Sequence, residues 1–129
     1  MSYIPKYIVK RMLPKNCISA TETGLKIAMV NVISPISIDE IPDDFLSYID
    51  VKVNGESVGQ DVLKGLKITS EDLTITVDNV QDALGKTIPV GGHLNVEVPY
   101  KVESGKEYEF EIEIKSDNPI NIKVKRTVQ

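Results

Sequence analysis

The chain has 129 residues, of which 41% are hydrophobic and 26% are charged. This length indicates a single domain, and the composition is typical of a folded globular protein, which excludes disorder over the whole chain. The net charge of −4 argues against the continuous basic surface that nonspecific nucleic-acid binding requires, so we expect no nucleic-acid partner.

Residues 1–15 differ from the rest of the chain, and we treat them as a basic, apolar N-terminal arm on a β-sandwich domain over residues 16–129. The arm contains four cations and no acidic residue, so the acidic excess lies in the domain. Whether it forms a helix or a strand, several of its apolar residues share one face. A segment this apolar is expected to be covered by a contact.

Three explanations for the arm remain open. It packs on its own domain, as a first strand for example; it docks on a second copy or a partner protein, by strand addition or as a helix in a groove; or it binds a membrane surface or nucleic acid. The acidic domain opposes the last of these, so we expect no membrane partner. For a docking arm, partner binding is assigned to its large apolar and basic side chains: Tyr3, Tyr7, Ile8, Lys10, Arg11 and Met12.

Cys17 is the only cysteine of the chain, so an internal disulfide and a multi-cysteine metal site are excluded. We expect it to pack as a small buried hydrophobe. A lone cysteine favours a reducing compartment. No stretch approaches the roughly 20 apolar residues of a membrane helix, and basic residues interrupt the N-terminal apolar run, unlike a signal peptide. We therefore expect a cytoplasmic protein.

The middle of the chain contains period-two segments separated by turn signals. Apart from Lys26 and Asn31, the segment from Leu25 to Ile33 is apolar on both faces, which suits a central strand. Asn54-Gly55 is typical of a tight hairpin. Two short helices are expected, over 39–48 and over 78–85, the second with Asp78 as its N-terminal cap and Gly85 as its stop. The remaining strands are predicted at Tyr48–Val53, Leu66–Ile68, Leu73–Val77 and Leu94–Val98.

The last third of the chain predicts a β-hairpin. Glutamates alternate with apolar residues over 107–114, apolar residues alternate with polar ones from Ile120, and a turn-forming cluster over 116–119 separates the two. Matching the apolar faces pairs Ile114 with Ile120. The same register gives the further pairs Ile112–Ile122, Phe110–Val124, Glu111–Lys123 and Glu109–Lys125. The row of glutamates is then a salt-bridged, solvent-facing surface.

Together these elements predict an all-β protein: an immunoglobulin-like antiparallel β-sandwich of about seven or eight strands with one or two short helices. The segment over 90–124 is similar to the closing strands of an immunoglobulin-like fold. The paired cysteines and core tryptophan of true immunoglobulin domains are absent, and this architecture by itself implies no function.

Few residues are candidates for chemistry, and we assign no catalytic residue and no cofactor. Asp39, Asp43 and Asp44 form the densest carboxylate group, although their spacing is not that of an EF-hand. His93 follows two glycines in an expected turn and is the only histidine. Asp39, Asp43, Asp44 and His93 are therefore the candidate ligands of a metal site. Oxygen and imidazole ligands from separate loops can converge on one ion.

We therefore favour a non-enzymatic β-sandwich that acts as an interaction or structural module, as a homo-oligomer or an accessory subunit of a larger cytoplasmic assembly. One alternative is a β-sandwich that binds a metal ion or carbohydrate through its loops. Another is an enzyme whose carboxylates come together only in three dimensions, which leaves no motif in the sequence.

Overall fold

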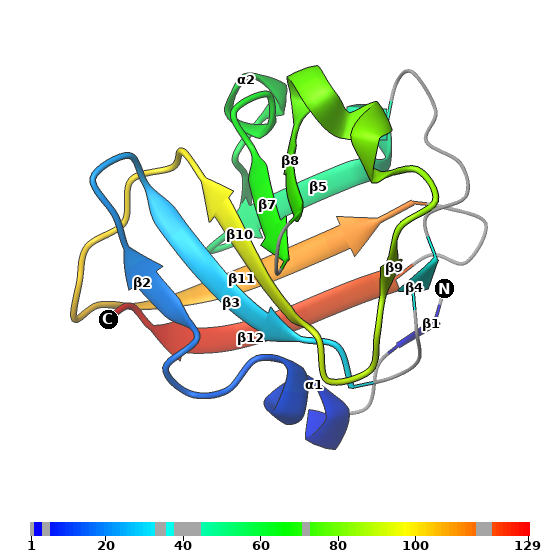
Figure 1. Ribbon diagram of the computed structural model, residues 1–129. Coiled ribbons are helices and arrows are strands. Elements are labelled where there is room, and N and C mark those ends of the chain that lie inside the picture. Colours follow the sequence, from blue (N-terminus) through cyan, green and yellow to red (C-terminus); the bar gives the residue numbers. More distant parts are fainter. Residues whose placement is uncertain (1, 4–5, 33–35, 38–44, 71–72, 116–119) are drawn as a thin grey trace.

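The computed structural model describes residues 2–3, 6–32, 36–37, 45–70, 73–115 and 120–129 (Figure 1). This part of the chain is mostly β-strand, arranged in two five-stranded sheets and a two-stranded ribbon, with few helical residues. The prediction of an all-β protein is therefore confirmed.

The first sheet is built around the C-terminal hairpin. Its neighbouring strands are antiparallel, except that the short β1 runs parallel to β12. In spatial order its strands are β1 (Ser2–Tyr3), β12 (Ile120–Thr127), β11 (Glu107–Ile114), β5 (Ile49–Val53) and β6 (Glu56–Ser57).

The second sheet is antiparallel throughout, and its strands cross in front of those of the first sheet in Figure 1. Its strands are, in order, β2 (Ile18–Ala20), β3 (Leu25–Val30), β10 (His93–Val98), β7 (Lys67–Ser70) and β8 (Leu73–Thr76). A separate ribbon pairs β4 (Ile36–Ser37) with β9 (Thr87–Ile88).

Four short helices connect the strands of the described chain: α1 (Lys6–Met12), the 3₁₀ helix η1 (Phe45–Tyr48), α2 (Gln60–Leu63) and the 3₁₀ helix η2 (Val77–Ala83). None of these helices has the length and apolar character needed to cross a membrane. In Figure 1, α1 lies at one end of the molecule and α2 at the opposite end.

One hydrophobic core draws side chains from both sheets and from α1 and the loop after it. Each group contributes residues that are nearly inaccessible to solvent, so the sheets and the N-terminal segment are packed around the same cluster. The buried members are Val9, Met12, Leu13, Cys17, Ile18, Leu25, Ile27, Val53, Leu66, Val98, Phe110, Ile122 and Val128.

The predicted C-terminal hairpin is confirmed pair by pair, including Ile114 opposite Ile120 and Glu111 opposite Lys123. The ion pair, however, forms diagonally, between Lys123 and Glu109 at 3.5 Å. Glu111 instead accepts a hydrogen bond of 2.8 Å from the Asn121 side-chain amide. Side chains two residues apart on facing strands are within reach of long residues, so the lysine is not restricted to its direct partner.

The predicted strands of the middle region are also found, with some changes at their ends. Asn54 and Gly55 both have positive φ, of 53° and 84°, as the tight turn between β5 and β6 requires. The strand expected from Leu25 ends at Val30. The turn over 116–119 and most of the helix expected over 39–48 lie outside the described residues, although η1 occupies the end of the latter.

The helix expected over 78–85 exists as η2, but its cap was predicted at the wrong residue. The N-cap is Thr76, whose backbone N–H donates to the Asn79 side-chain oxygen at 2.6 Å. Asp78 therefore lies inside the helix. Thr76 also ends β8, so the strand runs directly into the helix, as expected, but one residue earlier than predicted. The predicted stop is confirmed, since Gly85 has a φ of 82°.

Asn31, just after β3, is the buried polar residue of the described core, with 4% of its surface exposed. Its side-chain amide donates to the carbonyls of Ile88 and Pro89 at 3.2 and 3.3 Å. Its backbone N–H donates to the Gly92 carbonyl, and its own carbonyl accepts from the Gly91 N–H. Asn31 thus holds the loop between β9 and β10 against the end of β3.

Replacing Asn31 with alanine is expected to lower the free energy of unfolding by about 2 kcal/mol, because one buried and one partly buried carbonyl lose their donor. Urea unfolding followed by circular dichroism measures this change. Asn16→Ala is the matched control, since Asn16 is exposed and is expected to change stability by less than about 0.5 kcal/mol. Equal effects for the two variants would contradict the structural role of Asn31.

Candidate functional site

Helix α1 divides its side chains between the core and the solvent. Val9 and Met12 are buried in the core, as is Leu13 just after the helix. Their spacing of three and four residues places them on one face of a helix. Tyr7, Lys10 and Arg11 share the same spacing on another face and are exposed. Among the large hydrophobic residues of the described chain, Tyr7 is the most exposed, at 67%.

The six residues assigned to partner binding thus differ in accessibility. Tyr7, Lys10 and Arg11 face solvent, Ile8 is half-buried against the core, and Met12 is only 8% exposed. Tyr3 lies in β1, paired with Asn121 of β12. Met12 could contact a partner only if α1 moved away from the sheets, so its part in such a contact is the least compatible with the packing. The partner-binding role of the others stays a prediction.

Arg126 of β12 fixes the end of this helical segment. Its Nε and one terminal nitrogen donate to the Leu13 carbonyl at 3.1 and 2.6 Å, and the other terminal nitrogen donates to the Lys125 carbonyl at 2.7 Å. A cation is favourable at the C-terminal end of a helix, where backbone carbonyls lack partners within the helix. The guanidinium therefore joins the N-terminal arm to the last strand of the first sheet.

Cys17 lies close to Arg126 and is buried, as predicted. Burial raises the pKa of its thiol, although the charge and hydrogen bonding of Arg126 act in the opposite direction. The thiol is therefore protonated at neutral pH and a poor nucleophile. His93 is exposed at the start of β10 and has no hydrogen bond with Cys17. The two residues do not form a nucleophile and base pair.

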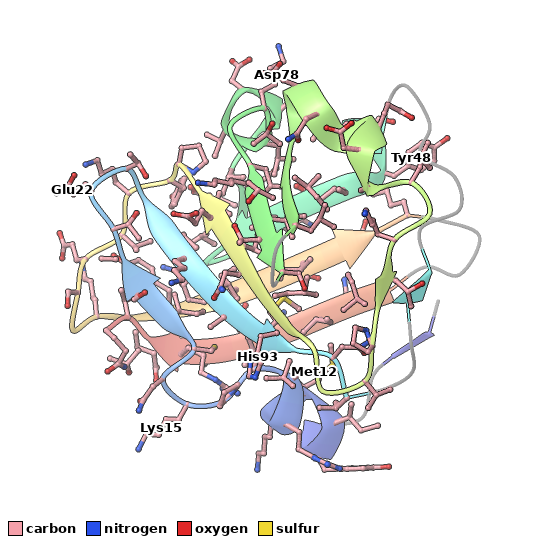
Figure 2. The ribbon with its side chains drawn as sticks, in the orientation of Figure 1. Met12, Lys15, Glu22, Tyr48, Asp78 and His93 are labelled. Atoms are coloured by element: carbon pink, nitrogen blue, oxygen red, sulfur yellow. The ribbon has the colours of Figure 1, made fainter. Side chains whose placement is uncertain are left out.

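A pocket of about 370 Å³ opens between the arm and the last strand, lined by Lys10, Lys15, Glu107, Lys125, Arg126 and Thr127. We refer to it as the basic pocket. Lys10 is on α1, and Lys15 lies on the loop that follows it (Figure 2). The other lining residues come from β11 and β12. Four cations and a single carboxylate thus converge in a protein whose overall charge is negative.

Sequence reasoning identified the arm but not the pocket. Lys10 was singled out, whereas the β11 and β12 residues were interpreted as ordinary strand positions. One signal was present: Ile122 and Val124 occupy inward positions of β12, and Arg126 continues that face with a cation. A charged residue at an inward position at the end of a strand indicates a specific partner, which here is the Leu13 carbonyl.

The predicted metal ligands lie mostly outside the described part of the chain, so the predicted site is not tested there. Asp39, Asp43 and Asp44 lie outside the described residues, and His93 is exposed. Among the described residues, no group of three His, Cys, Asp or Glu side chains is close enough to hold a metal ion. The loop-mediated metal or carbohydrate site stays a prediction.

Neither a scan against models of protein families nor a search of curated proteins gives a match for this chain. The features of this chain that bear on function are the exposed face of α1 and the basic pocket beside it.

Proposed function

We propose that the protein is a non-enzymatic β-sandwich module that acts through protein–protein contacts, as a homo-oligomer or as an accessory subunit of a larger cytoplasmic assembly. Two antiparallel sheets that share one core support the sandwich, and an immunoglobulin-like arrangement is the finer form that we propose. A single, buried cysteine is compatible with a reducing compartment.

The observation that carries this proposal is the exposed face of α1. A tyrosine with 67% of its surface exposed stands beside Lys10 and Arg11 on a helix whose opposite side is anchored in the core. Tyrosine and arginine are enriched among the residues that dominate the energy of protein interfaces. A rigid helix also presents them without the ordering cost of a flexible segment. The face is therefore suited to binding another protein surface.

The double variant Tyr7→Ser/Arg11→Ser tests this function by light scattering after size-exclusion chromatography. The wild-type chain is expected to have a mass above the 14.3 kDa of one chain, and the variant is expected to be a folded monomer. Loss of one buried aromatic anchor typically weakens association by about 2 kcal/mol or more, which raises the dissociation constant roughly 30-fold. Lys86→Ser/Val90→Ser is the matched control, because it removes an exposed cation and an exposed hydrophobic residue elsewhere.

If the wild-type protein is monomeric, self-association is contradicted. The accessory-subunit form of the proposal then remains to be tested. In that case, a photo-crosslinking amino acid at position 7 should give one discrete adduct in cells, whereas the same group at position 90 should not. A monomer that gives no specific adduct at position 7 would contradict the proposed function as a whole.

A further inference from the structure

The basic pocket brings together cations from distant parts of the sequence. Lys10 and Lys15 belong to the N-terminal arm, and Lys125 and Arg126 belong to the last strand. The hydrogen bonds from Arg126 to the Leu13 carbonyl hold these two segments side by side. The positions from which the lysines extend are therefore set by the fold, and a ligand would not have to assemble them.

The lysines of this pocket lack the carboxylate partners that five other lysines of the described chain have. Within the described chain, no carboxylate forms an ion pair with Lys10, Lys15 or Lys125. The lysines that do form ion pairs there are Lys64, Lys67, Lys106, Lys115 and Lys123. Glu107 lines the pocket but also forms no ion pair among the described residues. Clustered like charges repel one another, and an anion in the pocket would offset that repulsion.

We infer that the basic pocket binds a phosphorylated anion that carries at least two phosphoryl groups. Four cations against one carboxylate leave an excess of about three positive charges. A single carboxylate ligand supplies one negative charge, whereas each phosphate monoester supplies about 1.5 to 2 at neutral pH. Two phosphoryl groups therefore match the charge of the pocket. Its volume of about 370 Å³ is at the lower end of the range for small-molecule sites.

The donors of the pocket have separate roles. The ammonium groups of the three lysines and the Thr127 hydroxyl are available to phosphate oxygens. Arg126 already donates to two backbone carbonyls through three of its N–H groups, so it acts mainly as a positioning residue and a fixed positive charge. Glu107 opposes the anion and limits its affinity. This site goes beyond the proposed function, because it recognises phosphoryl groups and requires no contact with Tyr7.

Isothermal titration calorimetry with inorganic pyrophosphate, on the full chain at low salt, tests the inference. Lys15→Gln and Lys125→Gln are each expected to weaken binding about tenfold, as the loss of one charge-assisted hydrogen bond does. Glu107→Gln is expected to tighten it several-fold. Lys64→Gln is the matched control, since Lys64 ends α2 at the opposite end of the molecule and should alter affinity by less than about twofold. All four side chains are exposed, and circular dichroism checks that the variants remain folded.

The source of the phosphoryl groups is decided by a second titration, with a peptide that carries two adjacent phosphoserines and with the same peptide unphosphorylated. Tighter binding of the phosphopeptide than of pyrophosphate indicates a phosphorylated protein segment, and the reverse order indicates a free small molecule; both outcomes support the inference. No saturable binding of either phosphorylated probe would overturn it. Equal losses from Lys64→Gln and Lys125→Gln would also overturn it, because binding would then reflect the overall charge and not the pocket.

Discussion

Leu13→Ala is expected to lower the free energy of unfolding by about 2–5 kcal/mol, the range for removing a leucine side chain from a packed core. Leu13 is 1% exposed and belongs to the same buried cluster as Phe110 and Ile122 of the first sheet. Its carbonyl also accepts two hydrogen bonds from Arg126. Urea unfolding of the variant and the wild type, fitted with a common slope, measures the difference.

Tyr7→Ala is the matched control for this experiment. Tyr7 is on the same short segment but 67% exposed. At a protein concentration low enough to keep the wild type monomeric, its truncation is therefore expected to change stability by no more than about 0.5 kcal/mol. A large loss for Leu13 and a small one for Tyr7 would show that the buried face of residues 9–13 folds as part of the core. Equal small losses would mean that the arm is not held in the core in solution, and would restore the possibility that its apolar face binds a partner.

The packing of the arm also determines how its function can be examined. A deletion of residues 1–14 would remove Val9, Met12 and Leu13 from the core, and would expose the apolar residues that they cover. Any change in oligomeric state would then combine a lost interface with an opened core. Substitutions on the exposed face, at Tyr7 and Arg11, separate these two effects because they leave the buried face intact.

The elements that the sequence predicts best are those whose signal is local. The hairpin of β11 and β12 was predicted in the correct register because matching the apolar positions of the two strands also places two glutamates opposite lysines. The turn at Asn54-Gly55 was predicted because its backbone requires positive φ. The predicted cap of η2 was wrong because Thr76 and Asp78 are both residue types that can cap a helix. Only the position at which β8 ends selects Thr76.

The candidate site was less predictable because it depends on long-range pairing. Lys10 and Lys125 lie more than a hundred residues apart in the chain, and nothing near either one indicates the other. Their meeting follows from two facts of the folded state: Leu13 is buried in the core, and Arg126 donates to its carbonyl. Periodicity identifies which face of an element is buried, but it does not identify the element that covers that face.

Gly24→Ala is expected to destabilise the protein by about 3 kcal/mol, as an inserted group does when rigid backbone surrounds it. Gly24 is buried immediately before β3, where the chain turns from β2. A Cβ there would lie 2.6 Å from the Tyr100 backbone nitrogen and 2.8 Å from the Pro99 Cα, and closer still to the Val98 carbonyl oxygen. Because these neighbours are backbone atoms, no side-chain rotation relieves the contact.

Gly105→Ala provides the comparison that separates steric crowding from backbone strain. Gly105 has a φ of 86° with no atom within 4 Å of an added Cβ, so the same substitution there has only the cost of a left-handed conformation, about 1–2 kcal/mol. In thermal unfolding, Gly24→Ala is expected to have a clearly lower melting temperature than Gly105→Ala. If both melt at the same temperature, the turn before β3 relaxes without cost. The close approach of that turn to the end of β10 would then be dispensable for holding the central strands of the second sheet together.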